Sequence, residues 1–221
     1  MSNAARYDGL AGWYEDFRPE LSVPELEALE RLLGRGAGRC LDLGCGTGVS
    51  TEAAAELGWS MVGVDVSPDV LEVARGRGLD VRETAANALP FEAASFEAAI
   101  SVWTHTDLAF AAAVAEVARV LRAEAPFVYV GAHPCFVGPH SAFVAAEGVP
   151  EFHPGYRPSR EYDASAPGVA NPEGLRARVG GTHLTLHDFF AAFSAAGFVI
   201  ERFEELGDRD YPHVIALRAR R

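Results

Sequence analysis

Apolar residues in the first part of this chain form short runs that alternate with segments of helical periodicity. The short runs predict strands at 39–43, 60–66, 79–82, 96–102 and 126–131. The periodic segments predict helices at 49–57, 68–75 and 107–121, with Ser67 and Asp107 as N-caps. Strands that alternate with helices in this way make right-handed crossovers and therefore build a parallel sheet.

The two ends of the chain follow other patterns. Residues 7–33 carry leucines at helical spacing, and prolines interrupt them, which predicts two short helices within an N-terminal cap over 1–33. Near the C-terminus a helix at 186–196 precedes strands at 198–206 and 213–219, whose connection is too short for a parallel pair. We therefore expect an α/β fold with a doubly wound, mostly parallel, seven-stranded sheet. One antiparallel strand lies near its C-terminal edge, and helices cover both faces.

The alternation stops between residues 132 and 182, which are rich in proline, glycine, histidine and aromatic residues. This stretch is too long for a simple connection, and long structured loops beside a site usually shape a pocket. We expect a single domain over 1–221 in which 132–182 is an inserted substrate lid. Its arginines either pair with neighbouring acids or receive an anionic substrate; they are Arg157, Arg160, Arg176 and Arg178.

Charge and composition narrow the classes of function. The formal net charge of -12 disfavours nucleic acid as a partner, because phosphate backbones are bound by basic surfaces. The chain has no apolar run of membrane-spanning length and no signal-peptide pattern, so we expect a cytoplasmic protein without a membrane partner, monomeric or homodimeric. The 3 cysteines lack metal-ligand spacing, and we expect no metal. Every basic residue is an arginine, which excludes chemistry that requires lysine.

A glycine-rich motif, LDLGCGTG at 41–48, joins the first predicted strand to the first helix. Its glycines at alternate positions bare the backbone where a ligand touches it, and the free amides of the helix add positive potential. Asp42 lies just before these glycines. Asp65 ends the next strand, where an acid suits the two hydroxyls of a ribose.

The motif and its surroundings resemble class I S-adenosylmethionine-dependent methyltransferases, over 7–131 and again over 185–221. The resemblance implies S-adenosylmethionine as cofactor and S-adenosylhomocysteine as product. It implies that Asp65 binds the ribose, that Val66 flanks the adenine, and that Asp42 holds the loop and the amino group. Other implied or expected cofactor contacts are the loop residues Gly44, Cys45, Gly46 and Gly48, the Ser101 carbonyl, Ala86, Asn87, and the ring face of Tyr14.

Two positions depart from the family pattern. The family often has an aspartate before the Leu-Pro-Phe run at 89–91, near Ala85 or Ala86, and this chain has no acid there. Either Asn87 or a backbone group alone then recognises adenine. The second departure is the Arg-Ala-Glu-Ala run at 122–125, where relatives usually turn with Pro-Gly-Gly.

Methyl transfer requires alignment and, for some acceptors, a base that frees the nucleophile. His105 follows the fourth predicted strand and His133 follows the fifth, and both are candidates for that base. The Ser-Val-Trp-Thr run at 101–104 is not the motif of nucleic-acid base methylation. With the acidic charge, this favours transfer to O or N of a small-molecule acceptor.

Two other functions remain open from the sequence. A dinucleotide-dependent oxidoreductase would need glycine at the position of Val49 to complete its fingerprint. A non-catalytic protein that only binds S-adenosylmethionine is suggested by the absent adenine-side acid.

Overall fold

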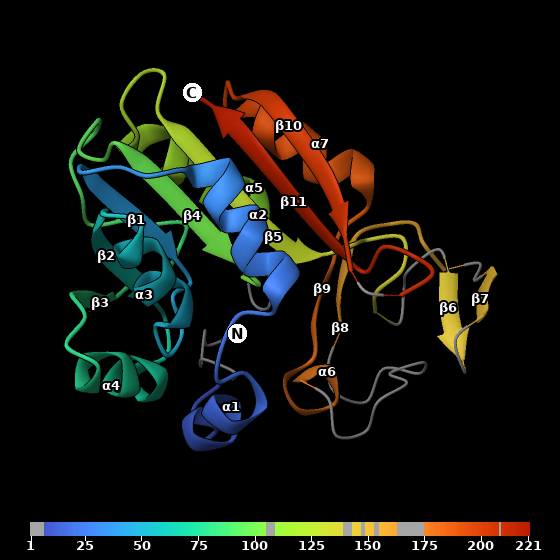
Figure 1. The fold of residues 1–221 in the computed structure, drawn as a ribbon. Coiled ribbons are helices and arrows are strands. Elements are labelled where there is room, and N and C mark those ends of the chain that lie inside the picture. Colours follow the sequence, from blue (N-terminus) through green and yellow to red (C-terminus); the bar gives the residue numbers. More distant parts are fainter. Residues whose placement is uncertain are drawn as a thin grey trace.

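A computed structural model describes residues 7–104, 109–138, 143–146, 149–152, 155–162, 175–207 and 209–221. Two helices open the chain, α1 (Ala11–Phe17) and α2 (Val23–Leu33), as the leucine spacing predicts. A capping box between Ser22 and Glu25 fixes the start of α2, with a proline in its first turn. The apolar face of α2 lies on the central sheet (Figure 1).

The central sheet has seven strands in the order β10-β11-β5-β4-β1-β2-β3. β11 is antiparallel to both of its neighbours, and the other pairs are parallel, which confirms the expected fold class. The strands are β1 (Arg39–Leu43), β2 (Ser60–Asp65), β3 (Val81–Glu83), β4 (Ala98–Val102), β5 (Pro126–Ala132), β10 (Val199–Leu206) and β11 (Val214–Arg220).

The order of the strands reverses between β1 and β4, because the chain runs outward from β1 to β3 and then returns to β4 beside β1. In open α/β sheets, ligands bind at such a reversal, beyond the carboxyl ends of the strands. The glycine motif follows β1 and therefore lies at this point of the sheet.

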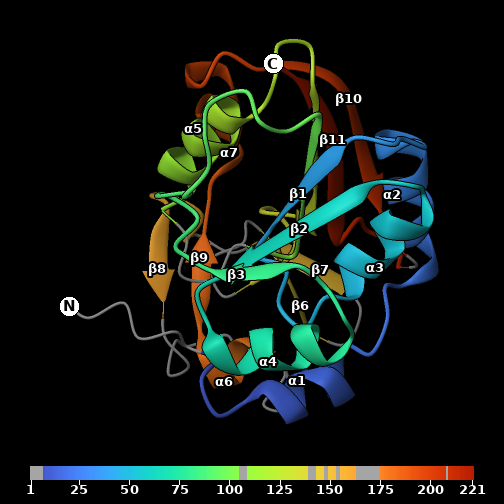
Figure 2. The ribbon, with the colours of Figure 1, turned by 90° about the vertical axis from the view of Figure 1, so that its left-hand side faces the viewer.

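Helices cover both faces of the sheet (Figure 2). α5 (Phe110–Val120) and α7 (Leu186–Ala195) lie on one face, and α2 and α3 (Val49–Glu56) lie on the other. The alternation of side chains along β5 separates two cores: Phe127 and Tyr129 pack toward α5 and α7, and Val128 and Val130 pack toward α2. The first core is rich in phenylalanine and the second is mostly aliphatic.

Element boundaries differ from the sequence predictions in several places. α5 begins at Phe110 with Ala109 at its N-cap, so the predicted start at 107 is wrong, and Asp107 itself lies outside the described residues. α4 (Pro68–Gly76) has Ser67 at its N-cap as predicted, but the Ser67 hydroxyl donates to Asp8 and not to the helix. β3 begins only at Val81, later than predicted.

Residues 132–182 contain short elements that the sequence pattern did not predict. The strands β6 (Phe143–Ala146) and β7 (Val149–Phe152) pair with each other, as do β8 (Arg160–Tyr162) and β9 (Gly181–His183). The short helix α6 (Leu175–Val179) lies beside α1 (Figures 1 and 2), and the Arg178 guanidinium stacks on the Trp13 ring at 4.4 Å. This region therefore extends toward the N-terminal cap.

None of the helices in the described part of the chain has the length and apolar character needed to cross a membrane.

Replacement of Phe193 tests the aromatic core between the sheet, α5 and α7. Phe193 is fully buried, and its ring contacts those of Phe110, Phe127 and Phe198. Phe193→Ala should lower the free energy of unfolding by about 3–5 kcal/mol, measured by urea denaturation. The matched control is Phe203→Ala, whose side chain is 40% exposed and should cost less than about 1 kcal/mol. Equal losses would contradict this view of the core.

Candidate active site

The three glycines of the motif have different roles, although all lie in left-handed backbone regions, with φ of +70° at Gly44, +53° at Gly46 and +95° at Gly48. A Cβ on Gly44 would lie 2.0 Å from Thr104, and one on Gly48 would lie 2.2 Å from Leu79, so internal packing requires glycine at both positions. A Cβ on Gly46 would meet only Tyr14, at 3.7 Å. Gly46 is therefore the glycine whose bare backbone is available to a ligand.

The carboxylate of Asp42 is fully buried beneath the loop and joins β1 to the first turn of α3. Its Oδ2 accepts hydrogen bonds of 2.7 Å from both hydroxyls at the start of that helix, Ser50 and Thr51. Its Oδ1 is buried and has no hydrogen-bond partner among the described residues. Burial raises the pKa of Asp42 from 3.8 to about 6, against the lowering effect of the two hydroxyls.

A second buried polar atom without a partner in the described structure lies in the same loop, the Oγ1 of Thr47. Buried polar groups in folded proteins are nearly always hydrogen-bonded, and an exception calls for an explanation. An acceptor on Asp42 and a hydroxyl on Thr47, both left open beside the bare backbone of Gly46, fit a polar ligand with donor and acceptor groups.

Asp65 connects the end of β2 to the glycine loop. Its Oδ2 accepts from the Gly46 N–H and its Oδ1 accepts from the Ser67 N–H, both at 3.0 Å. The residue remains partly exposed, and each carboxylate oxygen keeps a further lone pair that can accept a hydroxyl. Burial raises the pKa of Asp65 above its ordinary value, while the backbone hydrogen bonds oppose that rise. Asp65 therefore braces the loop and still presents acceptors to a ligand.

The N-terminal cap covers the glycine loop. Tyr14 and Arg18 line a small cavity together with Gly44, Cys45 and Trp103. The Arg18 guanidinium lies 4.9 Å from the centre of the Trp103 ring and forms an ion pair of 2.8 Å with the buried Glu25. The indole N–H of Trp103 donates to the same carboxylate.

The sequence motifs do not predict that Arg18 and Thr104 lie beside the glycine loop. The Thr104 hydroxyl donates to the carbonyl of Leu43 at 2.8 Å, next to Gly44. No spacing rule marks either residue, because α1 and the end of β4 meet the loop only in three dimensions.

The residues expected near adenine follow β2 and β3. Val66 directly follows Asp65 and is partly buried, Ala86 packs against the core, and Asn87 is exposed. Ser101 is buried within β4. Their contacts with a cofactor stay predictions.

Of the two histidines predicted as bases, the structure describes only His133. His105 lies outside the described residues. His133 is buried; its Nδ1 accepts from the Cys135 N–H at 3.1 Å, and its Nε2 lies 2.9 Å from a carboxylate oxygen of Glu205. Burial lowers the pKa of His133, and the Glu205 carboxylate opposes this. With both ring nitrogens engaged, His133 holds the turn after β5 in place.

No group of three or more metal-binding side chains occurs among the residues that the structure describes. The Nε2 of His183 faces the carbonyl of Tyr156 at 2.8 Å, and His187 is exposed.

Comparison with known proteins shows the family to which the glycine loop and its strands belong. Residues 41–129 match a family model described as "Methyltransferase domain". These residues form a class I methyltransferase domain. In fold, the chain is similar to an S-adenosylmethionine-dependent methyltransferase structure from Mesorhizobium loti, with a TM-score of 0.69, 24% identity and coverage of 97% of this chain and 99% of that one.

Curated relatives of the methyltransferase domain have different acceptors. An uncharacterised methyltransferase of Mycobacterium tuberculosis is 38% identical over 121 residues, which are 52% of this chain and 47% of that protein. A ubiquinone biosynthesis O-methyltransferase of Xylella fastidiosa is 31% identical over 75 residues, 32% of this chain and 30% of that protein. An 18S rRNA (guanine-N(7))-methyltransferase of Schizosaccharomyces pombe is 36% identical over 83 residues, which are 34% of this chain and 30% of that protein.

The chain thus spans about half the length, 47%, of the first curated relatives that it matches. The names of these relatives do not point to one acceptor for this chain.

The raised pKa of Asp42 gives the methyltransferase domain a measurable pH dependence. Because the folded-state pKa of about 6 lies above the ordinary 3.8, ionisation of Asp42 weakens the folded state. Its contribution to stability is present below pH 3.8 and is lost as the pH rises through about 6, a change of roughly 3 kcal/mol. In Asp42→Asn this change should be absent.

Urea denaturation of wild type and Asp42→Asn across that pH range measures the free energy of unfolding of each. Subtracting one from the other removes the contributions of the other carboxylates. Ser50→Ala, which removes only one hydroxyl donor, should keep the pH dependence and raise the pKa of Asp42 further. If the difference between wild type and Asp42→Asn is independent of pH, the buried carboxylate does not titrate as described.

Proposed function

We propose that this chain transfers a methyl group from S-adenosylmethionine to O or N of a small-molecule acceptor. The observation that carries the proposal is a pair of buried polar atoms without partners in the described structure, Asp42 Oδ1 at the end of β1 and Thr47 Oγ1 in the glycine loop. In the same loop, a side chain at Gly46 would meet only Tyr14. Buried polar atoms without a partner call for an explanation, and a bound polar ligand would supply one for both.

The residues present fit this cofactor. Asp42 would accept from its amino group, Asp65 would accept from the ribose hydroxyls, and the loop at 44–48 would lie along the methionine part. Val66, Ala86 and Asn87 would flank the adenine, with Tyr14 and the Ser101 carbonyl near the methionine end. When bound, the cofactor supplies a methyl group on a sulfonium, activated for in-line displacement; the chain's own residues bind, orient and exclude water.

A cavity beyond the carboxyl end of β5 supports a small apolar acceptor. Aromatic and aliphatic side chains form most of its wall, among them Tyr129, Val137, Leu184 and Phe189. Thr182 is also part of the lining, and its Oγ1 is buried without a partner in the described structure. An acceptor that reached this small recess with one polar group would pair with that hydroxyl.

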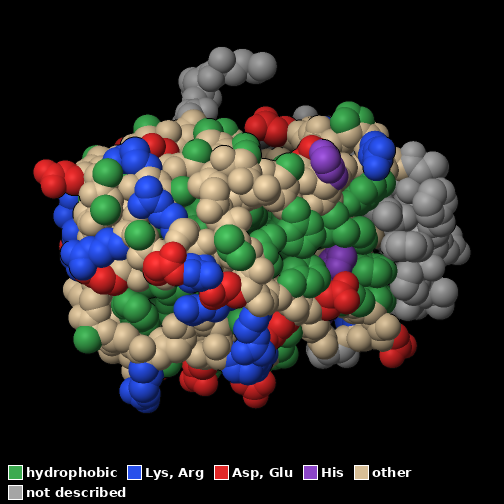
Figure 3. All heavy atoms as spheres, turned by 90° about the horizontal axis from the view of Figure 1, so that it is seen from above, with side chains coloured by type: hydrophobic (Ala, Val, Ile, Leu, Met, Phe, Trp, Pro, Cys, Tyr) green, Lys and Arg blue, Asp and Glu red, His purple; other side chains and the backbone are tan. Residues whose placement is uncertain are grey.

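The surface charge supports the same acceptor class. Arginine and acidic side chains are interspersed on the face shown in Figure 3. Arg218 and Arg220 both pair with Glu201, and Arg31 pairs with Glu204. Such neutralised arginines do not form the basic stripe that nucleic-acid backbones require.

The proposal also includes a general base and a division of the chain into a cap, a lid and a core. We assign the role of general base to His105, with His133 as a second candidate whose engaged ring makes it the weaker one. We propose that 1–221 is one domain, with 1–33 as a helical cap and 132–182 as a substrate lid. A cytoplasmic location and a monomeric or homodimeric state complete the proposal.

Replacement of Asp65 tests the cofactor. Asp65→Asn keeps the size of the side chain and removes an acceptor from the ribose side, so the affinity for S-adenosylhomocysteine should fall by about 1–3 kcal/mol in titration calorimetry. The matched control is Asp80→Asn at an exposed position near Arg82, which should leave the affinity unchanged. If wild type does not bind S-adenosylhomocysteine at all, the proposed function is wrong.

Replacement of Thr182 tests the acceptor pocket. Methyl transfer to a panel of small hydroxyl and amine compounds, detected by mass shift, should show turnover on at least one of them. If no compound is methylated, the result favours a non-catalytic binding protein. For any acceptor found, Thr182→Val should raise KM about five- to tenfold, because one hydrogen bond is lost, and leave the affinity for S-adenosylhomocysteine unchanged. Ser194→Ala, which removes an exposed hydroxyl, is the control. Turnover only on guanine in RNA would overturn the acceptor class.

A further inference from the structure

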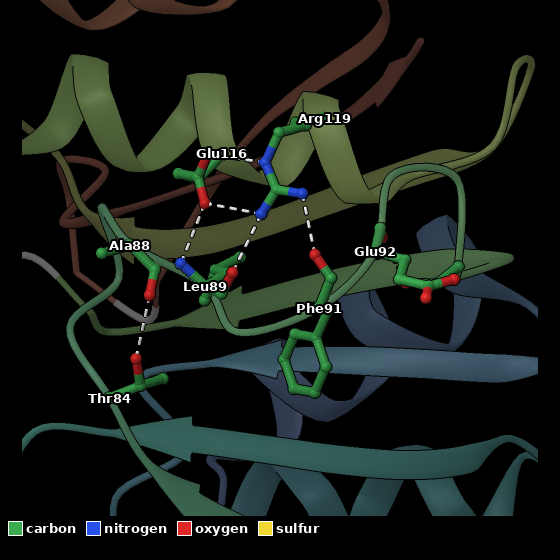
Figure 4. A network of polar contacts seen from close by, with 8 residues as sticks. Thr84, Ala88, Leu89, Phe91, Glu92, Glu116 and Arg119 are labelled. Atoms are coloured by element: carbon green, nitrogen blue, oxygen red, sulfur yellow. Dashed lines mark hydrogen bonds and ion pairs between the residues drawn. The ribbon is translucent and has the colours of Figure 1, made fainter.

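Two charged residues on α5 hold the segment that follows β3 (Figure 4). Glu116 accepts a hydrogen bond of 2.9 Å from the Leu89 N–H. Arg119 donates to the Leu89 carbonyl at 2.9 Å and to the Phe91 carbonyl at 2.8 Å. Two side chains therefore bind three backbone groups of one short segment.

The two side chains also bind each other. Arg119 Nε lies 2.8 Å from Glu116 Oε1, and Arg119 Nη2 lies 2.8 Å from Glu116 Oε2, so the guanidinium and the carboxylate form a bidentate pair. Such a pair is planar and directional, which makes it suited to holding a backbone at a fixed place. The pKa of Glu116 is accordingly lowered, first by the hydrogen bond from Arg119. We call Glu116 and Arg119 the α5 clamp.

The clamped segment lies next to the ribose-side acid. The Thr84 N–H donates to the Asp65 carbonyl at 2.9 Å. The Thr84 hydroxyl donates to the Ala88 carbonyl at 3.0 Å, and the Ala88 N–H donates to the Ala85 carbonyl at 3.1 Å, which closes a turn. Ala86 and Asn87 lie within this turn, and no hydrogen bond of their N–H groups to the described residues is present.

This turn occupies the place where an adenine-side acid is absent from the sequence. A flexible acid side chain can adjust to the base, whereas a backbone N–H recognises a ring nitrogen only if the backbone is already in position. Besides the clamp, the segment from Ala85 to Phe91 is tied to the fold by apolar packing: Leu89 is buried, and Ala86 and Phe91 pack against the core.

We propose that Glu116 and Arg119 are positioning residues for adenine recognition: they fix the backbone at 84–91 so that the N–H groups of Ala86 and Asn87 bind the base in place of an acidic side chain. The inference rests on the proposed function, since it requires an adenosyl cofactor. It adds two residues on α5 that contact this segment at Leu89 and Phe91.

The experiment compares two ligands that differ only in the base, S-adenosylhomocysteine and S-inosylhomocysteine. Adenine offers an acceptor at its N1, whereas hypoxanthine carries a proton there and cannot accept from a backbone N–H. Wild type should therefore bind the adenosyl compound more tightly in calorimetry, by about tenfold or more for one lost hydrogen bond. Arg119→Ala should weaken the adenosyl compound by about tenfold and bring the ratio of the two dissociation constants close to one.

Other variants separate positioning from general stability. Glu116→Gln keeps an oxygen that accepts from the Leu89 N–H and should retain much of the preference, whereas Glu116→Ala should lose it. The control is Arg122→Ala, whose side chain is 57% exposed and pairs with Glu97, away from the turn. If Arg119→Ala does not fold, Thr84→Val removes the hydrogen bond that closes the turn and should lower the same ratio.

The outcomes are distinguishable. Failure of wild type to bind S-adenosylhomocysteine overturns the proposed function and this inference with it. Binding by wild type with an unchanged ratio in the folded clamp variants overturns this inference alone. An equal loss of affinity for both ligands also overturns it, because that is the effect of a merely structural role.

Discussion

The buried carboxylate of Asp42 is the contact on which the site depends. It joins the end of β1 to the first turn of α3 through two hydroxyls, and the glycine loop is the short connection between those two elements. A carboxylate without solvent is unfavourable, and the raised pKa of Asp42 reflects that cost. Its Oδ1 has no donor among the described residues, and there the proposed cofactor would bind.

The surrounding structure supports this junction from several directions. Asp65 holds the middle of the loop through the Gly46 N–H, Thr104 fills the space beside Gly44, and Leu79 fills the space beside Gly48. The N-terminal cap then covers the loop, with Arg18 and Trp103 fixed by the buried Glu25. Each contact comes from a different part of the chain, so the loop is held from several sides.

The α5 clamp extends the same principle to the other end of the site. The family pattern places an acid near Ala86, and here a hydrogen-bonded backbone turn stands in that region. Such a turn costs conformational entropy to order, and Glu116 and Arg119 oppose that cost with three backbone hydrogen bonds. Under the proposed role, the absence of the acid is linked to two residues on α5.

The sequence by itself determined the order of elements in the central sheet, the antiparallel strand, the glycine loop, and the positions of the acids Asp42 and Asp65. These follow from local rules: apolar periodicity, the conformational freedom of glycine, and the position of an acid at a strand end. Only the tertiary structure decided that Gly46 is the open glycine and that His133 is engaged by Glu205. It also decided that Arg18 and Thr104 lie at the glycine loop and that Arg119 holds the segment at 89–91. The physical reason is that these features depend on distances between elements far apart in the chain, and the patterns read from the sequence record only what neighbouring residues do.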